Sequence, residues 1–194
     1  MIALALTIIA AYLVGSIPFG LILTRAAGLG DIRQIGSGNI GATNVLRTGN
    51  KGLAAATLAL DLGKGLVVVL LARADLAGIA AVAVVAGHIF PPWLRFNGGK
   101  GVATAAGAIL AYVPPVGLAA GATWLVVAAV TRYSSLAAII ATCAAPLYAW
   151  AFTRAPGPTV TILVIALLVL WRHWGNMVRL VHGEESRIGA GKGG

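Results

Sequence analysis

Long apolar stretches alternate with short polar ones along most of the chain. A membrane-spanning helix needs about 20 apolar residues. Seven stretches reach or approach that length, namely 2–24, 53–71, 76–90, 102–113, 116–130, 135–152 and 159–174. The pattern therefore predicts an all-α integral membrane protein with about seven transmembrane helices.

Two of these stretches are irregular. Gly15, Ser16 and Pro18 are expected to bend the first one, because proline removes a backbone donor and clashes with the preceding turn. The stretch 102–113 is too short to cross a bilayer alone. The first stretch lacks the basic start of a signal peptide, so we interpret it as a span. We predict one membrane-embedded domain over 1–194, with 185–194 as a flexible, Gly-rich tail.

Composition supports the membrane class. The chain is 59% hydrophobic with a mean hydropathy of +0.94, far from the values of soluble domains. It carries 14 Lys and Arg against five acidic residues. No basic stripe with interleaved aromatic residues is present, which argues against a nucleic-acid partner. Cys143 stands alone in an apolar run, so it is expected to be a small buried residue and not a disulfide or metal ligand.

The basic residues predict the orientation. Arg73 and Arg154 flank one side of the predicted spans, and Lys64 lies within a span. The opposite side collects Arg25, Arg33, Arg47, Lys51, Arg95, Lys100, Arg132, Arg172, Arg179, Arg187 and Lys192. Cytoplasmic loops carry the excess of Lys and Arg, so we expect a periplasmic N-terminus and a cytoplasmic C-terminus. All the unusual polar motifs then lie on the cytoplasmic face, which suggests one site open to the cytosol.

The densest polar motif is Gly-Ser-Gly-Asn-Ile-Gly-Ala-Thr-Asn-Val-Leu-Arg, residues 36–47. Glycines let backbone N–H groups approach a ligand, and concave clusters of such groups bind anions. Arg47 adds a planar guanidinium group, which can bind phosphate or carboxylate through two parallel hydrogen bonds. The motif predicts an oxyanion or phosphate site, while an ordinary polar connector between two helices is the alternative.

A second motif, Gly98-Gly99-Lys100-Gly101, leads directly into an apolar helix. Free N–H groups and the positive end of a helix dipole bind phosphate at such a place. This is not a nucleotide-binding Walker A loop, because Lys100 is followed by Gly101 and Leu94 occupies the position of the first glycine. The alternative is a Gly-rich turn with a lysine that reaches toward the headgroups.

Other ionisable residues lie near these motifs. Asp61 and Lys64 are one helical turn apart inside a span, and we favour a structural ion pair, with a role in shaping the site as the alternative. His173, Asn176 and Arg179 are spaced by three, so they lie near one helical face and could present hydrogen-bond donors to the site. An amphipathic helix with basic residues at the headgroups is the alternative. Glu184 is expected to pair with an arginine and to fix the loops, with a role as general base as the less favoured alternative.

Covalent catalysis has little support in the sequence. There is no Gly-x-Ser-x-Gly elbow, and Ser37 has no adjacent base along the chain. His88 and His173 could transfer protons only if folding places them. No cluster of His, Cys and Asp has metal-ligand spacing, so we predict no metal and no cofactor.

Residues 36–47, 87–104 and 172–184 together resemble the three signature regions of the bacterial acyl-phosphate:glycerol-3-phosphate acyltransferase family, usually called PlsY. Residues 61–65 and 131–136 add to the resemblance, with Ser135 taken as the family serine. The resemblance implies a multi-pass inner-membrane enzyme that moves a fatty acyl group from acyl phosphate to the 1-hydroxyl of glycerol 3-phosphate, giving lysophosphatidic acid and phosphate.

The resemblance and the motifs assign roles to individual residues. The resemblance places Ser37, Thr43, Arg47, Lys100, Ser135, His173 and Asn176 along the site. We predict catalytic roles for Ser37, Arg47, Lys100, His173 and Asn176. Substrate or phosphate binding is predicted for Gly36, Gly38, Asn39, Thr43, Asn44, Gly98, Gly99, Gly101, Thr104 and Ser135. Structural support is predicted for Asp61, Lys64, His88, Arg179 and Glu184.

These roles predict direct attack on acyl phosphate without an acyl-enzyme, by a monomer whose partners are the two substrates and membrane lipids. A transporter of a phosphorylated anion is the main alternative, although such proteins carry polar groups at mid-membrane and internal repeats. A structural scaffold is a third possibility, but it does not explain the density of glycines and cations.

Overall fold

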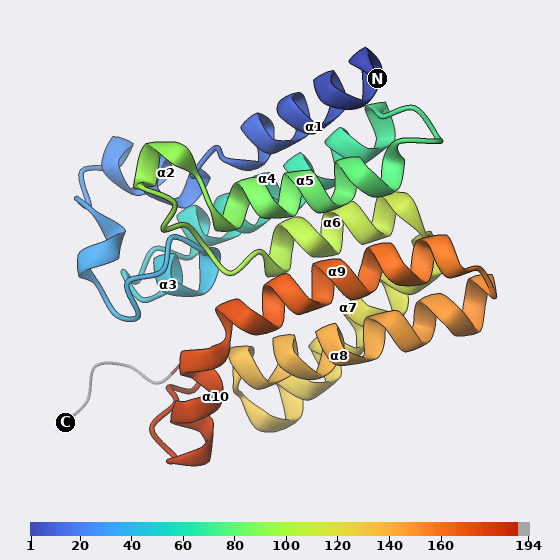
Figure 1. Cartoon of the computed structure of the whole chain (residues 1–194). Helices are drawn as coiled ribbons and strands as arrows, with labels where there is room; N and C mark the ends of the chain where they lie inside the picture. The colour runs from blue at the N-terminus through green and yellow to red at the C-terminus, as the bar shows by residue number, and fades with distance from the viewer. Residues whose placement is uncertain (190–194) are drawn as a thin grey trace. The chain divides into compact units, whose positions relative to one another are not determined.

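The computed structural model describes residues 1–189, and Lys192 and the rest of 190–194 lie outside that range. Within it the chain is all helical. The α-helices are α1 (Ile2–Gly15), α2 (Phe19–Ala26), α3 (Ala42–Leu46), α4 (Lys51–Leu71), α5 (Ala77–Ile89), α6 (Val102–Tyr112), α7 (Pro114–Thr131), α8 (Ser134–Thr153), α9 (Pro156–Arg172) and α10 (Trp174–Val181). Two short 3-10 helices, η1 (Ile32–Gln34) and η2 (Pro92–Leu94), lie in the polar loops (Figure 1).

The predicted apolar stretches all form helices. Among the described residues, five stretches are long and apolar enough to cross a membrane, and the pair α9 and α10, bent by 57°, raises this to six. The 11-residue α6 is the short element expected at 102–113. The first span is broken between α1 and α2 at residues 16–18, as Ser16 and Pro18 predict. Seven spans and the orientation of the termini stay predictions.

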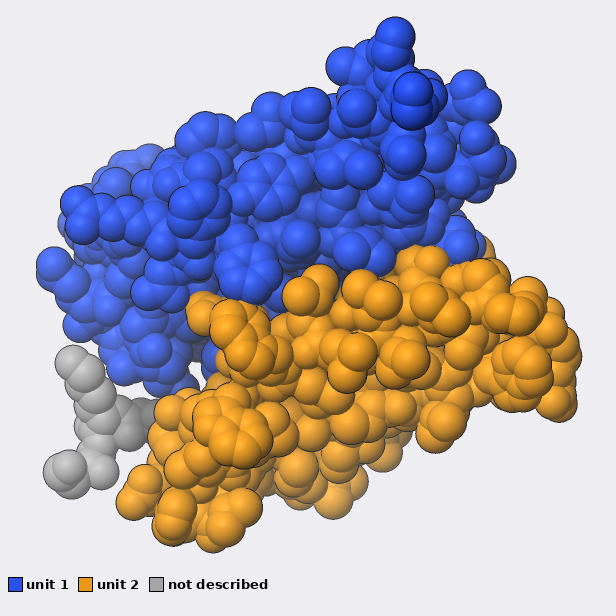
Figure 2. Space-filling view, viewed as in Figure 1, with its two compact units in different colours: residues 1–112 blue, residues 113–194 orange. Residues whose placement is uncertain are grey.

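The chain divides into two compact units, residues 1–112 and the part that begins at Val113 (Figure 2). The first contains α1 to α6 and both Gly-rich loops. The second contains α7 to α10. The single domain over 1–194 stays a prediction.

Glycines set the helix contacts of the first unit. A methyl group added to Gly15 of α1 would lie 2.1 Å from the Val84 carbonyl oxygen of α5, and one added to Gly87 would lie 2.1 Å from that of Tyr12. Gly65 and Gly107 bring α4 and α6 together in the same way. Without a hydrophobic force between helices in lipid, such small residues let backbones approach closely and gain dispersion contacts.

Alanines do the same in the second unit. Ala137, Ala141, Ala145 and Ala149 recur every four residues and are all buried along one face of α8, which packs against both α7 and α9. Cys143 lies off this face and is exposed. The expectation of a buried Cys143 was therefore wrong, because an apolar segment does not reveal which of its faces meets a neighbouring helix.

Candidate active site

Asn44 organises the polar loop at residues 36–47. Its side chain is 1% exposed. The Asn44 Nδ2 group donates to the carbonyl oxygens of Ile32, Ile35 and Asn39 at 3.0, 2.9 and 2.8 Å. Its Oδ1 accepts from the Ser37 backbone N–H at 3.1 Å and from Ser37 Oγ at 3.3 Å. Asn44, which we predicted as a ligand-binding residue, therefore supports the loop, because its amide is committed to the loop's own backbone.

A small hydrophobic core packs against the buried side of this loop. It consists of the buried residues Leu21, Ile32, Ile40, Val45 and Ala54 from α2, η1, the loop, α3 and α4. Three polar side chains of the motif, Ser37, Thr43 and Arg47, are exposed and lie away from this core, whereas Val45 is fully buried in it. Because Ile40 and Val45 alternate with polar residues, burial of these two apolar side chains leaves Ser37, Thr43 and Arg47 at the surface.

Asn39 Oδ1 is buried and has no hydrogen-bond partner among the described residues.

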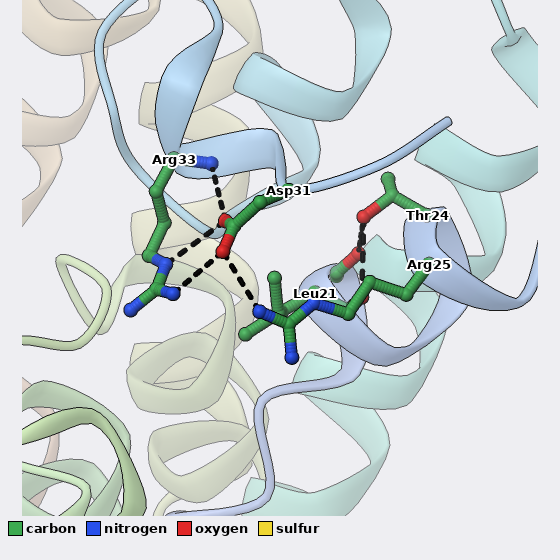
Figure 3. Close-up of polar contacts among 6 residues, drawn as sticks. Leu21, Thr24, Arg25, Asp31 and Arg33 are labelled. Atoms are coloured by element: carbon green, nitrogen blue, oxygen red, sulfur yellow. Dashed lines mark hydrogen bonds and ion pairs between the residues drawn. The ribbon is translucent and has the colours of Figure 1, made fainter. Parts of the chain in front are cut away.

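Two arginines and one carboxylate fix the start of the loop (Figure 3). Asp31 accepts from the Arg33 backbone N–H at 3.0 Å, from Arg33 Nε at 2.9 Å and from Arg25 at 2.8 Å. The Arg33 guanidinium holds the pKa of Asp31 well below its usual range. In the same view, the Thr24 hydroxyl donates to the carbonyls of Gly20 and Leu21 in α2. The charges of Arg25 and Arg33 are thus partly neutralised by Asp31, in ion pairs that stabilise the fold.

Gly36 shows why the motif needs glycine at that position. Its φ is +57°, and a methyl group there would lie 2.5 Å from Asn44 Oδ1 and 2.7 Å from Arg47 Cδ. The Arg47 side chain therefore passes directly over the Gly36 backbone. This contact places Arg47 against Gly36, the residue that precedes Ser37, although Gly36 and Arg47 are eleven positions apart in the sequence.

We expect Gly36→Ala to lower the activity of this site about 10- to 100-fold, because it displaces Asn44 and Arg47 by a substantial fraction of an ångström. Gly28→Ala is the matched control. Gly28 also has positive φ, +73°, but a methyl group there meets no atom within 4 Å. It should cost about 1 kcal/mol of backbone strain and leave activity near wild type. Initial rates of both variants, normalised to folded protein, check this, and equal losses would contradict it.

The second Gly-rich loop is built on the end of α5. The N–H groups of Gly98 and Gly99 donate to the carbonyls of Ile89 and His88 at 3.0 and 3.1 Å. A methyl group on Gly99 would lie 2.0 Å from His88 Nε2, so the loop lies against the imidazole. Both N–H groups therefore have partners within the chain, and the binding of an anion at Gly98 and Gly99 stays a prediction.

The first turn of α6 remains available for that role. A helix leaves its first N–H groups without intrahelical partners, and α6 begins at Val102 directly after Gly101. Lys100, which is half-buried, precedes this turn. The Thr104 hydroxyl is buried and has no partner in the described part of the chain.

A buried polar cluster connects α4, α5 and the break between α1 and α2. Lys64 Nζ lies 2.8 Å from Asp61 Oδ1, and both side chains are at most 3% exposed. Lys64 also donates to the Ile17 carbonyl at 2.9 Å and lies 2.9 Å from His88 Nδ1. The ion pair expected from the spacing of Asp61 and Lys64 is present. An ammonium has no acceptor, so we assign Nδ1 of His88 as acceptor and place the imidazole proton on Nε2.

The remaining predicted residues lie in the second unit. His173 is buried at the bend between α9 and α10, and its Nδ1 lies 2.7 Å from the Val169 carbonyl, which can only accept. Asn176 Nδ2 donates to Glu185 Oε1 at 2.7 Å, and Arg179 Nε donates to Glu185 Oε2 at 2.8 Å. Ser135 is buried, and its Oγ meets the geometry of a hydrogen bond with none of the described residues, although it lies close enough to the Glu185 carboxylate to stabilise the charge there.

Glu185, not Glu184, is the carboxylate that pairs with arginine. After α10, Gly183 adopts a φ of +73°, and the Glu184 N–H returns to the Arg179 carbonyl at 2.8 Å. This helix-ending motif leaves the Glu184 side chain exposed and turns the next residue back onto α10. Two adjacent glutamates after a glycine cannot be told apart until that turn is known.

The surroundings of Glu185 favour its ionised form. Burial raises the pKa of the carboxyl, but the Ser135 hydroxyl, the Asn176 amide and the Arg179 guanidinium outweigh it, so the net pKa lies below its usual value. The carboxylate is therefore a charged anchor between α8 and α10. In the described part of the chain, no group of three or more His, Cys, Asp or Glu is placed to hold a metal ion.

The family model described as glycerol-3-phosphate acyltransferase matches residues 5–183. The chain belongs to this family. A glycerol-3-phosphate acyltransferase of Paramagnetospirillum magneticum is 56% identical over 199 residues, covering 99% of this chain and 97% of the relative. One of Rhodospirillum rubrum is 55% identical over 203 residues, covering 98% and 94%.

Two solved structures of the family have the same fold as this chain. The glycerol 3-phosphate form of PlsY (YgiH), described as an integral membrane glycerol 3-phosphate acyltransferase, matches with a TM-score of 0.91 at 38% identity and covers 96% of both chains. Its lysophosphatidic acid form matches with a TM-score of 0.88 at 36% identity, covering 95% of this chain and 94% of that one. These matches confirm the predicted family, the all-α integral membrane fold and the class of acyltransferase.

Proposed function

We propose that the protein transfers a fatty acyl group from acyl phosphate to the 1-hydroxyl of glycerol 3-phosphate, releasing phosphate and lysophosphatidic acid. The family is that of glycerol-3-phosphate acyltransferases, and its solved relatives are described in glycerol 3-phosphate and lysophosphatidic acid forms. We further propose that the protein is a monomer in the bacterial inner membrane, with its polar loops in the cytoplasm.

The observation that carries this proposal is the loop at residues 36–47. Asn44 holds it so that Ser37, Thr43 and Arg47 face outward together. Hydroxyls and a guanidinium in one small area suit a phosphate and a polarised carbonyl. Lys100 and the first turn of α6 offer a second cation and a second set of N–H groups for phosphate.

The proposed reaction is direct attack. The 1-hydroxyl oxygen of glycerol 3-phosphate forms a bond to the acyl carbon, the bond from that carbon to the phosphate oxygen breaks, and the hydroxyl proton passes to a phosphate oxygen. Ser37 is poorly suited to act as a nucleophile, because its hydroxyl lies 3.3 Å from an amide oxygen of Asn44 and an amide is too weak a base to activate it. Orientation and charge stabilisation then provide the rate enhancement.

The deciding experiment uses purified full-length protein in detergent with glycerol 3-phosphate and one of three donors: acyl phosphate, acyl-CoA or acylated carrier protein. We expect lysophosphatidic acid with acyl phosphate alone. Detergent leaves no second compartment, so product formation would also exclude a mere anion transporter. Product with acyl-CoA at an equal rate would contradict the proposed donor, and a mass increase of one acyl group on Ser37 during turnover would contradict direct attack.

A further inference from the structure

The segment after α10 is bound to the turn between α7 and α8. We call residues 185–188 the strap. The Ile188 N–H donates to the Arg132 carbonyl at 2.6 Å, and an Arg132 guanidinium nitrogen donates back to the Ile188 carbonyl at 3.0 Å. The strap thus engages both the backbone and the side chain of one turn residue, from 56 positions away in the sequence.

Arg187 adds a contact to the next residue of the turn. Its Nε donates to the Tyr133 hydroxyl at 3.1 Å, and its guanidinium carbon lies 5.3 Å from the centre of the Tyr133 ring. A guanidinium over an aromatic ring is an attractive cation–π contact. Tyr133 is the N-cap residue of α8, so Arg187 holds the side chain that precedes the helix carrying Ser135.

The other end of the strap is joined to α10. Glu185 accepts hydrogen bonds from Asn176 and from Arg179 at 2.7 and 2.8 Å, and only 7% of its side chain is exposed. Figure 1 shows α10 at the end of this unit where α7 leads into α8, and α10 contacts α8 directly. Four consecutive residues therefore connect the helix of Asn176 with the turn that precedes Ser135.

The strap adds to the local bonds of this turn. Arg132 adopts a φ of +62° as the C-cap residue of α7, and its N–H donates to the Ala128 carbonyl at 2.9 Å, a common left-handed ending of a helix. The Tyr133 N–H donates to the Thr131 hydroxyl at 3.2 Å. The N-cap residue of α8 forms no side-chain capping hydrogen bond, so the contacts of the strap with Arg132 and Tyr133 reinforce the start of that helix from a distant part of the chain.

We propose that the strap positions Ser135 and Asn176 for binding of glycerol 3-phosphate, with Arg187 as a positioning residue. This rests on the proposed function. Loosening the strap would lower the fraction of molecules with both side chains in place. A smaller competent fraction weakens apparent binding by the same factor, whereas saturating substrate restores the arrangement. The expected signature is a higher KM for glycerol 3-phosphate with an almost unchanged kcat.

The test compares Arg187→Ala with Arg154→Ala. Arg154 is a matched control, since it is an exposed arginine with φ +50° at the other end of α8 and forms no described side-chain contact. Losing one hydrogen bond and one cation–π contact corresponds to about a three- to tenfold rise in KM for Arg187→Ala. We expect Arg154→Ala and the conservative Arg187→Lys to stay within about twofold of wild type.

Two further measurements separate positioning from folding. Tyr133→Phe removes the acceptor of Arg187, so the double variant with Arg187→Ala should raise KM less than the product of the two single effects. A wild-type KM in Arg187→Ala would overturn the proposal. A fall in kcat and in thermal stability with unchanged KM would also overturn it, because that pattern reflects lost folded enzyme.

Hydrogen exchange tests the strap independently of catalysis. Amides of residues 131–137 should exchange faster in Arg187→Ala than in wild type or Arg154→Ala. Unchanged exchange would overturn the strap even if the enzyme is active. If wild-type protein made no lysophosphatidic acid while exchange responded as expected, the proposed function would fail and the structural hold would stand, but its role in binding glycerol 3-phosphate would be rejected.

Discussion

Replacement of Lys100 by alanine is expected to lower kcat/KM for acyltransfer about 10²–10³-fold, the usual cost of one lost group that stabilises transition-state charge. Lys100 stands between Gly99, which lies against the His88 ring, and Gly101, whose φ is +82°. The first turn of α6 follows at once, so a cation and free N–H groups occur at one place. Removing the ammonium removes the positive charge from that arrangement.

Lys51→Ala is the matched control for this variant. Lys51 is an exposed lysine at the first position of α4, in the same unit, and has no described side-chain contact. Steady-state rates of both variants should be compared at equal amounts of folded enzyme, with Lys100→Arg as a charge-preserving third variant. Activity of Lys100→Ala within about threefold of wild type, where surface substitutions usually fall, would remove Lys100 from the proposed mechanism.

The largest effect on stability is expected for Asp61→Ala, at about 3–5 kcal/mol, because it leaves the buried Lys64 ammonium without its counter-charge. Lys64 is buried and also holds the Ile17 carbonyl, so the break between α1 and α2 should loosen with it. Thermal unfolding of detergent-solubilised protein measures the loss. We expect a marked fall in midpoint and a lower yield of folded protein.

Two further variants test whether the unpaired charge of Lys64 causes the loss of stability. Asp75→Ala breaks an exposed ion pair with Arg73, whose side chains are 62% and 70% exposed, and should leave the midpoint unchanged. Asp61→Leu combined with Lys64→Met removes both buried charges and should recover most of the loss, since apolar replacement of a buried pair is often neutral. A double variant no more stable than Asp61→Ala would show that the charge imbalance is not the cause.

Local spacing was enough to predict the contacts between near neighbours. Asp61 and Lys64 are three positions apart on a helix, and such residues lie side by side whatever surrounds them. Pro18 likewise breaks the first span for a reason internal to its own ring. The helices themselves follow from long apolar runs, since only a helix satisfies all its backbone groups within one segment in lipid.

Contacts between distant segments could not be predicted in this way. Nothing near Asn44 in the sequence shows that its amide holds the carbonyl of Ile32, and nothing near Gly99 shows that His88 lies against it. The same is true of Glu185, which the turn at Gly183 orients, and of Cys143, which is exposed and lies off the buried face of α8. We predicted the residues of the strap as the start of a flexible tail, because their own sequence does not indicate that they contact Arg132 and Tyr133.

The sequence by itself therefore determined the membrane class, the helical segments and the family, because hydrophobicity, helical period and motif spacing are properties of the chain read in order. Only the tertiary structure decided which polar groups support the loops and which face outward. That division depends on hydrogen bonds between segments far apart in the chain. Asn44 and Ser37 are both polar residues of one motif, and packing alone makes the first a buried support and leaves the second exposed.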